Sequence, residues 1–283
     1  MGMELRRRFI QLAFLCLTNQ EVGNLFRGKI YKGEGKYLCA PGLNCYSCPA
    51  ATLSCPIGAL QTLGGSGYGP GFYVPGFLLV LGVLLGRMVC GFLCPFGFFQ
   101  ELLHKLPLPK KALYPPLRYI KYLMLLFLVL ALPIYQNSSF GIGEPAFCQY
   151  ICPAGTLEGA VPLLFTHPEF YQALGGLFAL KMAILLGVLL GCAVNHRFFC
   201  KTLCPLGAIY GLMNPISIYR MRMERARCLA CGKCAAVCPM ELNPVNQPNS
   251  PECIRCGKCS ALCPGGSLTM GFGEGFTQRR RTM

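Results

Sequence analysis

The stretch from Cys228 to Pro264 sets the organisation of this chain. It reads Cys-Leu-Ala-Cys-Gly-Lys-Cys-Ala-Ala-Val-Cys-Pro from Cys228 to Pro239, and Cys-Ile-Arg-Cys-Gly-Lys-Cys-Ser-Ala-Leu-Cys-Pro from Cys253 to Pro264. Each copy has three cysteines separated by two residues, a fourth cysteine after three more residues, and a proline directly behind it. This spacing is typical of thiolates that hold iron–sulfur cubes, because three ligands wrap one cube and the fourth reaches another.

The tandem spacing predicts a bacterial-type two-cluster ferredoxin domain over residues 217–283, behind a transmembrane domain over residues 1–216. Because the fourth cysteine of each copy ligates the other cluster, one [4Fe–4S] cluster is assigned to Cys228, Cys231, Cys234 and Cys263. The second is assigned to Cys253, Cys256, Cys259 and Cys238. Zinc is the competing occupant, but zinc sites favour two well-separated Cys-x2-Cys pairs.

Composition indicates that the remainder of the chain is embedded in a bilayer. Of its 283 residues, 53% are hydrophobic and 13% are charged, which is more apolar than an ordinary soluble domain. Twenty cysteines in a chain of this length favour metal ligation over a disulfide scaffold, which is short and secreted. The basic residues are not gathered on one soluble face, so nucleic acid is not an expected partner.

Four apolar runs predict a mainly α-helical, four-helix transmembrane domain. They cover residues 9–26, 72–92, 119–134 and 171–194; the second and fourth are long enough to cross a bilayer, and the third is slightly short. Lys and Arg follow the second and fourth runs, whereas residues 137–170 contain neither. Because positive residues stay inside, we expect a multi-pass protein of a bacterial or archaeal cytoplasmic (inner) membrane, with its ferredoxin domain in the cytoplasm.

A Cys-Pro-x-Gly core occurs four times and indicates an internal duplication. The cores begin at Cys55, Cys94, Cys152 and Cys204, and three of them have a partner four residues earlier, at Cys90, Cys148 and Cys200. The motifs alternate with the apolar runs, so each half of the membrane part carries one outer and one inner motif.

The two inner motifs share the spacing Arg-x2-Cys-x3-Cys-Pro-x-Gly. Two cysteines cannot hold a cube alone, but two motifs at the same depth supply four thiolates. We therefore expect an inner [4Fe–4S] cluster on Cys90, Cys94, Cys200 and Cys204, with Arg87 and Arg197 offsetting its charge. The alternative is that these are small buried cysteines that cap helices.

The outer side carries six cysteines, two more than one cube needs. We expect an outer cluster on Cys148, Cys152, Cys55 and one of Cys45 or Cys48. If this side is oxidising, Cys39 and a neighbour form a disulfide instead. The hydrocarbon core would separate inner and outer clusters by about 30 Å, unless the motif helices re-enter the membrane or a quinone bridges the gap.

Lys181, inside the fourth run, is a further candidate, since a charge at that depth is costly and often functional. It is expected to pair with Glu21 or to contact a quinone such as menaquinone or ubiquinone, unless its stem simply carries the charge to the interface.

These features together resemble the NapH/NosR-type family of membrane-bound polyferredoxins. The resemblance rests on the predicted spans, the twin inner motifs and the double ferredoxin motif, over about residues 71–264. It implies an iron–sulfur protein that passes electrons between the quinone pool, or a cytoplasmic donor, and periplasmic redox partners. The outer motifs depart from the family pattern and suggest an added terminal on the far face.

We therefore expect a membrane-integral iron–sulfur electron-transfer protein that relays electrons between a cytoplasmic or quinone donor and a partner redox protein, either on one face or across the membrane. Such a chain is an electron-transfer subunit of an oxidoreductase system rather than an enzyme that acts alone. The alternative is a non-redox assembly or maturation subunit whose clusters are structural.

Overall fold

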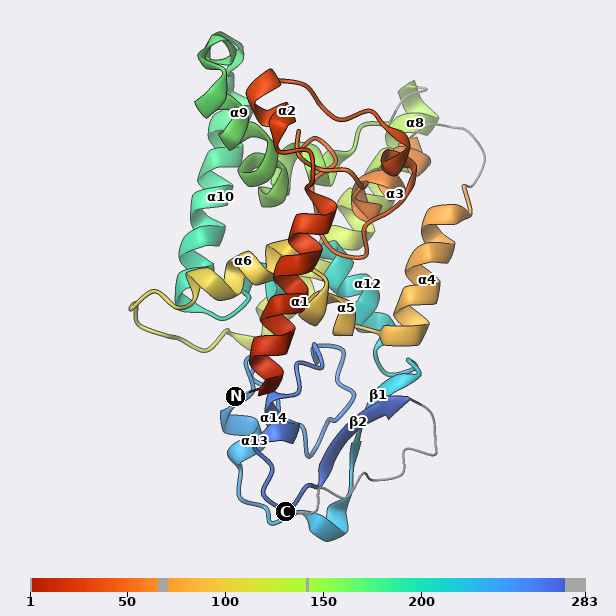
Figure 1. The fold of residues 1–283 in the computed structure, drawn as a ribbon. Helices are drawn as coiled ribbons and strands as arrows, with labels where there is room; N and C mark the ends of the chain where they lie inside the picture. Colours follow the sequence, from red (N-terminus) through yellow and green to blue (C-terminus); the bar gives the residue numbers. More distant parts are fainter. Residues whose placement is uncertain (1, 66–70, 141–142, 273–283) are drawn as a thin grey trace.

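The computed structural model describes residues 2–65, 71–140 and 143–272. A helical body stands above a smaller unit that contains β1 (Tyr219–Met223) and β2 (Leu268–Phe272) (Figure 1). The helix α1 (Gly2–Thr18) runs down to this unit, where Lys258 pairs with Glu4 at 3.5 Å. Residues 66–70 of the predicted outer segment and 273–283 of the predicted ferredoxin domain lie outside the described residues.

Two helices in the described ranges are long and apolar enough to cross a membrane. One is α10 (Gly176–Val194). The other is a continuous helix, Pro115–Asn137, that is longer than the predicted run 119–134. It begins as a 3₁₀ turn (Pro115–Tyr119) and continues through α7 (Ile120–Leu123), a π-helical stretch (Met124–Ala131) and α8 (Leu132–Phe140).

The other two apolar runs differ from their predicted extents. Helix α4 (Tyr73–Leu85) has 13 residues, about 20 Å of helix, and then the chain turns at Gly86 with φ 56° and ψ −141°. The rest of that run forms α5 (Met88–Phe92), so residues 72–92 are not the single helix that we expected. Helix α1 begins at Gly2 and ends at Thr18 rather than covering 9–26. The arrangement of four spans therefore stays a prediction.

Each of the four Cys-Pro-x-Gly cores begins a helical segment. Cys94 precedes α6 (Pro95–Leu103) and Cys204 precedes α12 (Pro205–Met213). Each thiol accepts a hydrogen bond from the glycine N–H three residues on, at 3.4 Å in α6 and 3.3 Å in α12. Proline suits the first helical position because the N–H that it lacks would have no partner there. The preceding cysteines lie in α5 and in α11 (Phe198–Thr202).

The outer motifs form the opposite end of the body (Figure 1). Helix α3 (Pro56–Gly65) follows Cys55, and the π-helical segments Phe147–Ile151 and Gly155–Ala160 lie on either side of Cys152. Helices α2 (Gly23–Arg27) and α9 (Val161–Thr166) meet there, where the Thr166 hydroxyl donates to Leu25 O at 3.0 Å. Two 3₁₀ turns, Glu34–Tyr37 and Pro168–Ala173, complete this end.

The lower unit is a two-stranded antiparallel sheet with three short helical turns. Met221 of β1 is opposite Met270 of β2. The turns are the 3₁₀ segment Arg225–Arg227, α13 (Lys233–Ala236) and α14 (Lys258–Ala261). Gly232 and Gly257 precede α13 and α14 with φ 72° and 80°, a left-handed backbone that glycine adopts without steric cost.

Ion pairs join this unit to the helical body. Glu252 pairs with Arg87 at 2.6 Å and also with Lys121, and Glu241 pairs with Lys201 at 3.0 Å. Burial alone would raise the pKa of the Glu252 carboxyl, but Arg87 and Lys121 outweigh it and hold that pKa below its ordinary value. The carboxylate is therefore ionised at neutral pH and ties the lower unit to two elements of the body.

Candidate metal centre

The eight cysteines of the lower unit surround two cavities. One cavity is lined by Cys228, Cys231, Cys234 and Cys263. The other is lined by Cys238, Cys253, Cys256 and Cys259. The fold thus brings the cysteines together in the two crossed groups that the spacing predicts. In the described part of the chain no three His, Cys, Asp or Glu side chains close around a single ion. Each cavity instead has four cysteine sulfurs in its lining, which is the donor set of a [4Fe–4S] cluster.

The inner motifs bring four further thiols into one buried site. Cys90, Cys94, Cys200 and Cys204 are each 5% exposed. The thiols of Cys94 and Cys204 each interact electrostatically with the other members of the set. Four soft sulfur donors in an apolar core fit a [4Fe–4S] cluster as ligands, so the donor set matches the predicted inner site.

The two arginines of the inner motifs cross between the halves of the duplication. Arg87 Nη2 donates to the carbonyl oxygen of Cys200 at 2.7 Å, and Arg197 Nη1 donates to that of Cys90 at 2.6 Å. A side chain at Gly97 or Gly207 would lie 3.3 Å from the opposite guanidinium. The glycine of each Cys-Pro-x-Gly core therefore leaves room for the arginine of the other motif.

Each arginine is also held by a carboxylate that the motif analysis missed. Arg87 pairs with Glu252, and Arg197 pairs with Glu101 at 2.6 Å. Glu101 also binds Arg7 at 2.6 Å, so a buried Arg-Glu-Arg chain leads from α1 to the inner site. Nothing in the local sequence indicates these pairs, because Glu101 lies 94 residues from Arg7 and 96 residues from Arg197 along the chain. Both arginines are thus positioned beside the thiols, with their charge shared with carboxylates.

The outer cavity is lined by Cys45, Cys55, Cys148 and Cys152. Of the two alternatives for the fourth ligand, the structure places Cys45 at the cavity. Cys48 instead packs with Ala50 and Ala51. Cys39 belongs to the same buried core as Cys55 and Cys152 without lining the cavity. All twenty cysteines, which fall within the described residues, are free thiols.

Lys181 also lines the outer cavity, where its Nζ donates to the carbonyl oxygen of Cys148 at 3.3 Å. The structure thus brings this cation to the outer thiols rather than to Glu21. A quinone contact of Lys181 stays a prediction.

The segment Pro41–Asn44, which we call the bridging loop, touches both membrane sites. A Cβ at Gly42 would lie 2.7 Å from Cys94 Cα of the inner motif. The backbone of Leu43 lies beside the Cys94 thiol, and that of Asn44 lies beside the Cys55 thiol of the outer motif. The bridging loop therefore packs inside the body between the inner and outer sites, and these sites are neighbours rather than about 30 Å apart as a full hydrocarbon core would require.

The residue six positions after each Cys-Pro cysteine faces these sites. These residues are Gln61, Gln100, Glu158 and Tyr210. The Tyr210 hydroxyl donates to Pro41 O at 3.0 Å, and a Glu158 carboxylate oxygen accepts the N–H of Cys45 at 2.7 Å. The second half of the duplication therefore holds the bridging loop at its first residue and at Cys45, the residue directly after it. The shared position in the four motifs was the one sequence signal that could have revealed them.

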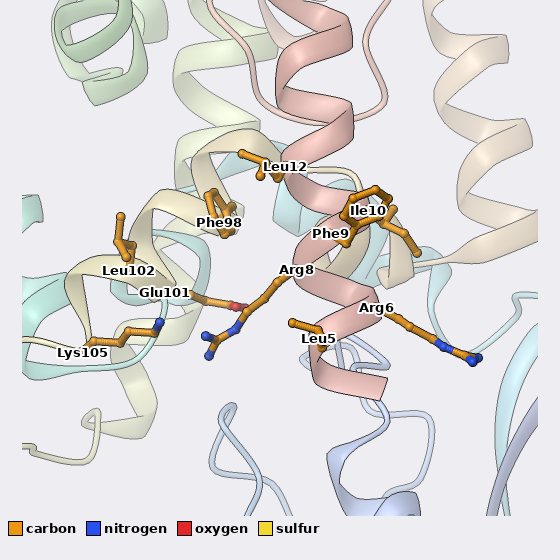
Figure 2. A pocket seen from close by; sticks show the side chains of 10 residues that line it. All are labelled: Leu5, Arg6, Arg8, Phe9, Ile10, Leu12, Phe98, Glu101, Leu102 and Lys105. Carbon is orange, nitrogen blue, oxygen red and sulfur yellow. The ribbon is translucent and has the colours of Figure 1, made fainter. Parts of the chain in front are cut away.

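A groove of about 660 Å³ runs between α1 and α6. Figure 2 shows Leu12 and Phe98 on its walls and the charged ends of Arg8, Glu101 and Lys105 gathered at one end. Glu101 at this end of the groove pairs with Arg197 of the inner motif, so one ion pair connects the groove to the inner motif.

Comparison with known proteins agrees with the cysteine geometry. A 4Fe-4S binding domain family matches residues 69–114, 122–162 and 177–222, and these three segments contain three of the four Cys-Pro motifs. No solved structure matches the chain.

Three relatives illustrate the likeness. YccM of Escherichia coli, whose name describes an electron transport protein, is 28% identical over 175 residues, which are 58% of this chain and 44% of YccM. The methylamine utilization ferredoxin-type protein MauN of Paracoccus denitrificans is 33% identical over 90 residues, 30% of this chain and 32% of MauN. The regulatory protein NosR of Pseudomonas aeruginosa is 28% identical over 171 residues, 56% of this chain and 21% of NosR.

The chain spans between 44% and 63% of the length of the first curated relatives that it matches. With the twin arginine–cysteine motifs, these matches show that the chain belongs to the NapH/NosR-type family of 4Fe–4S binding, ferredoxin-type proteins.

Proposed function

We propose that this chain is a membrane-integral electron-transfer protein with four [4Fe–4S] sites in series, two in the lower unit and two in the helical body. When bound, the clusters supply one-electron transfer, and the protein holds and tunes them. The observation that carries the proposal is that each pair of neighbouring sites shares a segment of chain.

The contacts between sites support this series. In the lower unit, the crossed cysteines Cys238 and Cys263 each come from the repeat that supplies the other cavity. Ile254, on the wall of the second cavity, packs against α5, where a Cβ at Gly91 would lie 2.5 Å from Ile254 O. Gly91 directly follows the inner ligand candidate Cys90. The bridging loop then joins the inner site to the outer one.

Placement in the membrane is part of the proposal. The two long apolar helices favour a bilayer as the surroundings of the body. The start of α1 and the lower unit lie at the same end (Figure 1), and Lys and Arg gather in the loops at that end. We assign that end to the cytoplasm on this asymmetry, with redox partners on either face.

A quinol is the electron donor that the membrane would offer, and the groove between α1 and α6 is its proposed binding site. The groove combines apolar walls with polar groups at one end, as sites for such ligands do. Added to the purified wild-type protein, a quinol analogue should reduce the inner cluster. It should fail to do so after Leu12→Trp, because the larger side chain fills the groove without touching a cysteine.

The competing function is an assembly or maturation subunit with structural clusters. Iron and acid-labile sulfide should be measured in protein purified without oxygen, followed by a reductive titration monitored by EPR. About sixteen irons per chain, all reducible and reoxidised by a partner, support the proposal. About eight irons would leave only the lower unit occupied and would remove the series of sites. Clusters that resist reduction would favour the structural role.

A further inference from the structure

Two glutamines stand at matching places in the duplication, and each faces the sulfur of a cysteine in the other half. Gln100 Nε2 lies 3.0 Å from Cys200 Sγ at the inner site, and Gln61 Nε2 lies 3.2 Å from Cys148 Sγ at the outer site. Both glutamines are fully buried. Both are the sixth residue after a Cys-Pro cysteine of the first half, and both sulfurs belong to the first cysteine of a motif in the second half.

The orientation of each amide follows from its other contacts. Gln61 Oε1 accepts the N–H of Phe147 at 2.8 Å, and Gln100 Oε1 accepts the N–H of Cys200 at 3.4 Å. A backbone N–H can only donate, so the amide oxygen must face it and the NH₂ group must face the sulfur. The NH₂ groups also donate to the carbonyl oxygens of Ile57 and Phe96, one turn earlier in each helix, which fixes their positions.

We propose that Gln61 and Gln100 are positioning residues that donate a hydrogen bond to one ligand sulfur of the outer and of the inner cluster, and so raise the reduction potential of each. This inference rests on the proposed function, because it requires both membrane sites to hold clusters. The physical reason is that an N–H donor stabilises the more negative, reduced cluster more than the oxidised one, and hydrogen bonds to the sulfurs are among the factors that set cluster potentials.

The second half of the duplication lacks such donors. Its equivalent residues are Glu158 and Tyr210, which hold the bridging loop instead. Each membrane site therefore receives one glutamine donor at this position rather than two, and removing one glutamine should affect one cluster and leave the other unchanged.

The test measures the potentials of both membrane clusters in the full chain by EPR-monitored redox titration. Gln100→Met keeps the length of the side chain and removes the donor, so the reduced-to-oxidised ratio of the inner cluster at a fixed potential should fall about tenfold, which is 59 mV for a one-electron couple. Gln61→Met should move only the outer cluster. Gln11→Met is the matched control, because Gln11 is equally buried and donates to Gly91 O at 2.9 Å beside the inner motif without a sulfur contact.

Reduced-to-oxidised ratios that stay within a factor of two of wild type in Gln61→Met and Gln100→Met would overturn the proposal, as would an equal change in Gln11→Met. If a variant loses its cluster, the test is carried out instead on wild-type protein labelled with ¹⁵N in the glutamine side chains. Pulsed EPR should then detect a ¹⁵N coupling at each membrane cluster, and its absence refutes the inference. A wild-type chain with only about eight irons would instead refute the proposed function.

Discussion

Replacing Gly42 by alanine would test whether the bridging loop is seated against the inner motif. The added Cβ would lie 2.7 Å from both Cys94 Cα and Leu93 O, and 3.2 Å from Pro95 Cδ. Carbon atoms pack comfortably at about 3.5–4.0 Å, so the loop or the Cys-Pro turn must move by about 1 Å. The turn cannot yield easily, because Cys94 caps α6 and its thiol accepts the Gly97 N–H.

The loop is therefore expected to lift away from the inner site. Overpacking of this size costs about 1–3 kcal/mol. The displacement also moves the backbone of Leu43 and Asn44 away from Cys94 and Cys55, and it stretches the hydrogen bond from Tyr210 to Pro41 O. The melting temperature should fall by about 5 °C, and the magnetic coupling between the two reduced membrane clusters should weaken.

Gly76→Ala is the matched control, because a Cβ at Gly76 meets nothing within 4 Å. Gly76 lies inside α4, where alanine is favoured over glycine by about 0.5–1 kcal/mol. The assays are calorimetry in detergent and EPR of the fully reduced protein. Equal melting temperatures and equal cluster coupling in the two variants would refute the reasoning that the loop seats against Cys94.

Three further predictions concern the cysteines, the crossed arginines and the docking carboxylate. Cys94→Ser should lower the iron content from about sixteen to about twelve atoms per chain. The control Cys16→Ser, at an exposed thiol outside the motifs, should leave the iron content unchanged. Unchanged iron in both variants would refute the prediction of an inner cluster. Arg197→Met should destabilise the fold by about 3–5 kcal/mol in thermal unfolding, because it removes a partner from buried Glu101. The control Arg227→Met, in an exposed pair with Glu224, should cost less than about 1 kcal/mol. Similar losses of stability in the two variants would contradict the importance of the buried Arg197–Glu101 pair. Burial would raise the pKa of Glu241, but Lys201 and its other partners hold it below the ordinary value. A lowered folded pKa gives stability that is present above the unfolded pKa and is lost as the pH falls through the folded pKa, so Glu241→Gln should weaken the fold at pH 7 and match wild type once the pH is below the folded pKa. A deficit that persists below that pH would count against this ion pair.

The sequence alone determined what depends on spacing along the chain. The intervals between Cys228 and Cys263 predict two crossed groups of four, because a short loop of given length can wrap only one side of a cube. The repeated Arg-x2-Cys-x3-Cys-Pro pattern likewise predicts the duplication and the pairing of the inner motifs. The Cys-Pro cores begin helices for a local reason, the fixed backbone of proline at the first helical position.

Only the tertiary structure decided which residues meet across long separations. Contacts between residues from different motifs decide three features of the sites. These are the exchange of Arg87 and Arg197 between motifs, the pairing of these arginines with Glu252 and Glu101, and the position of Cys45 rather than Cys48 at the outer cavity. The motif order predicted inner and outer clusters about 30 Å apart unless the motif helices re-enter the membrane or a quinone bridges the gap. Nothing in the motif order reveals that the loop at Gly42 packs against Cys94. Close packing of that loop in the core, rather than any local preference, brings the two membrane sites together.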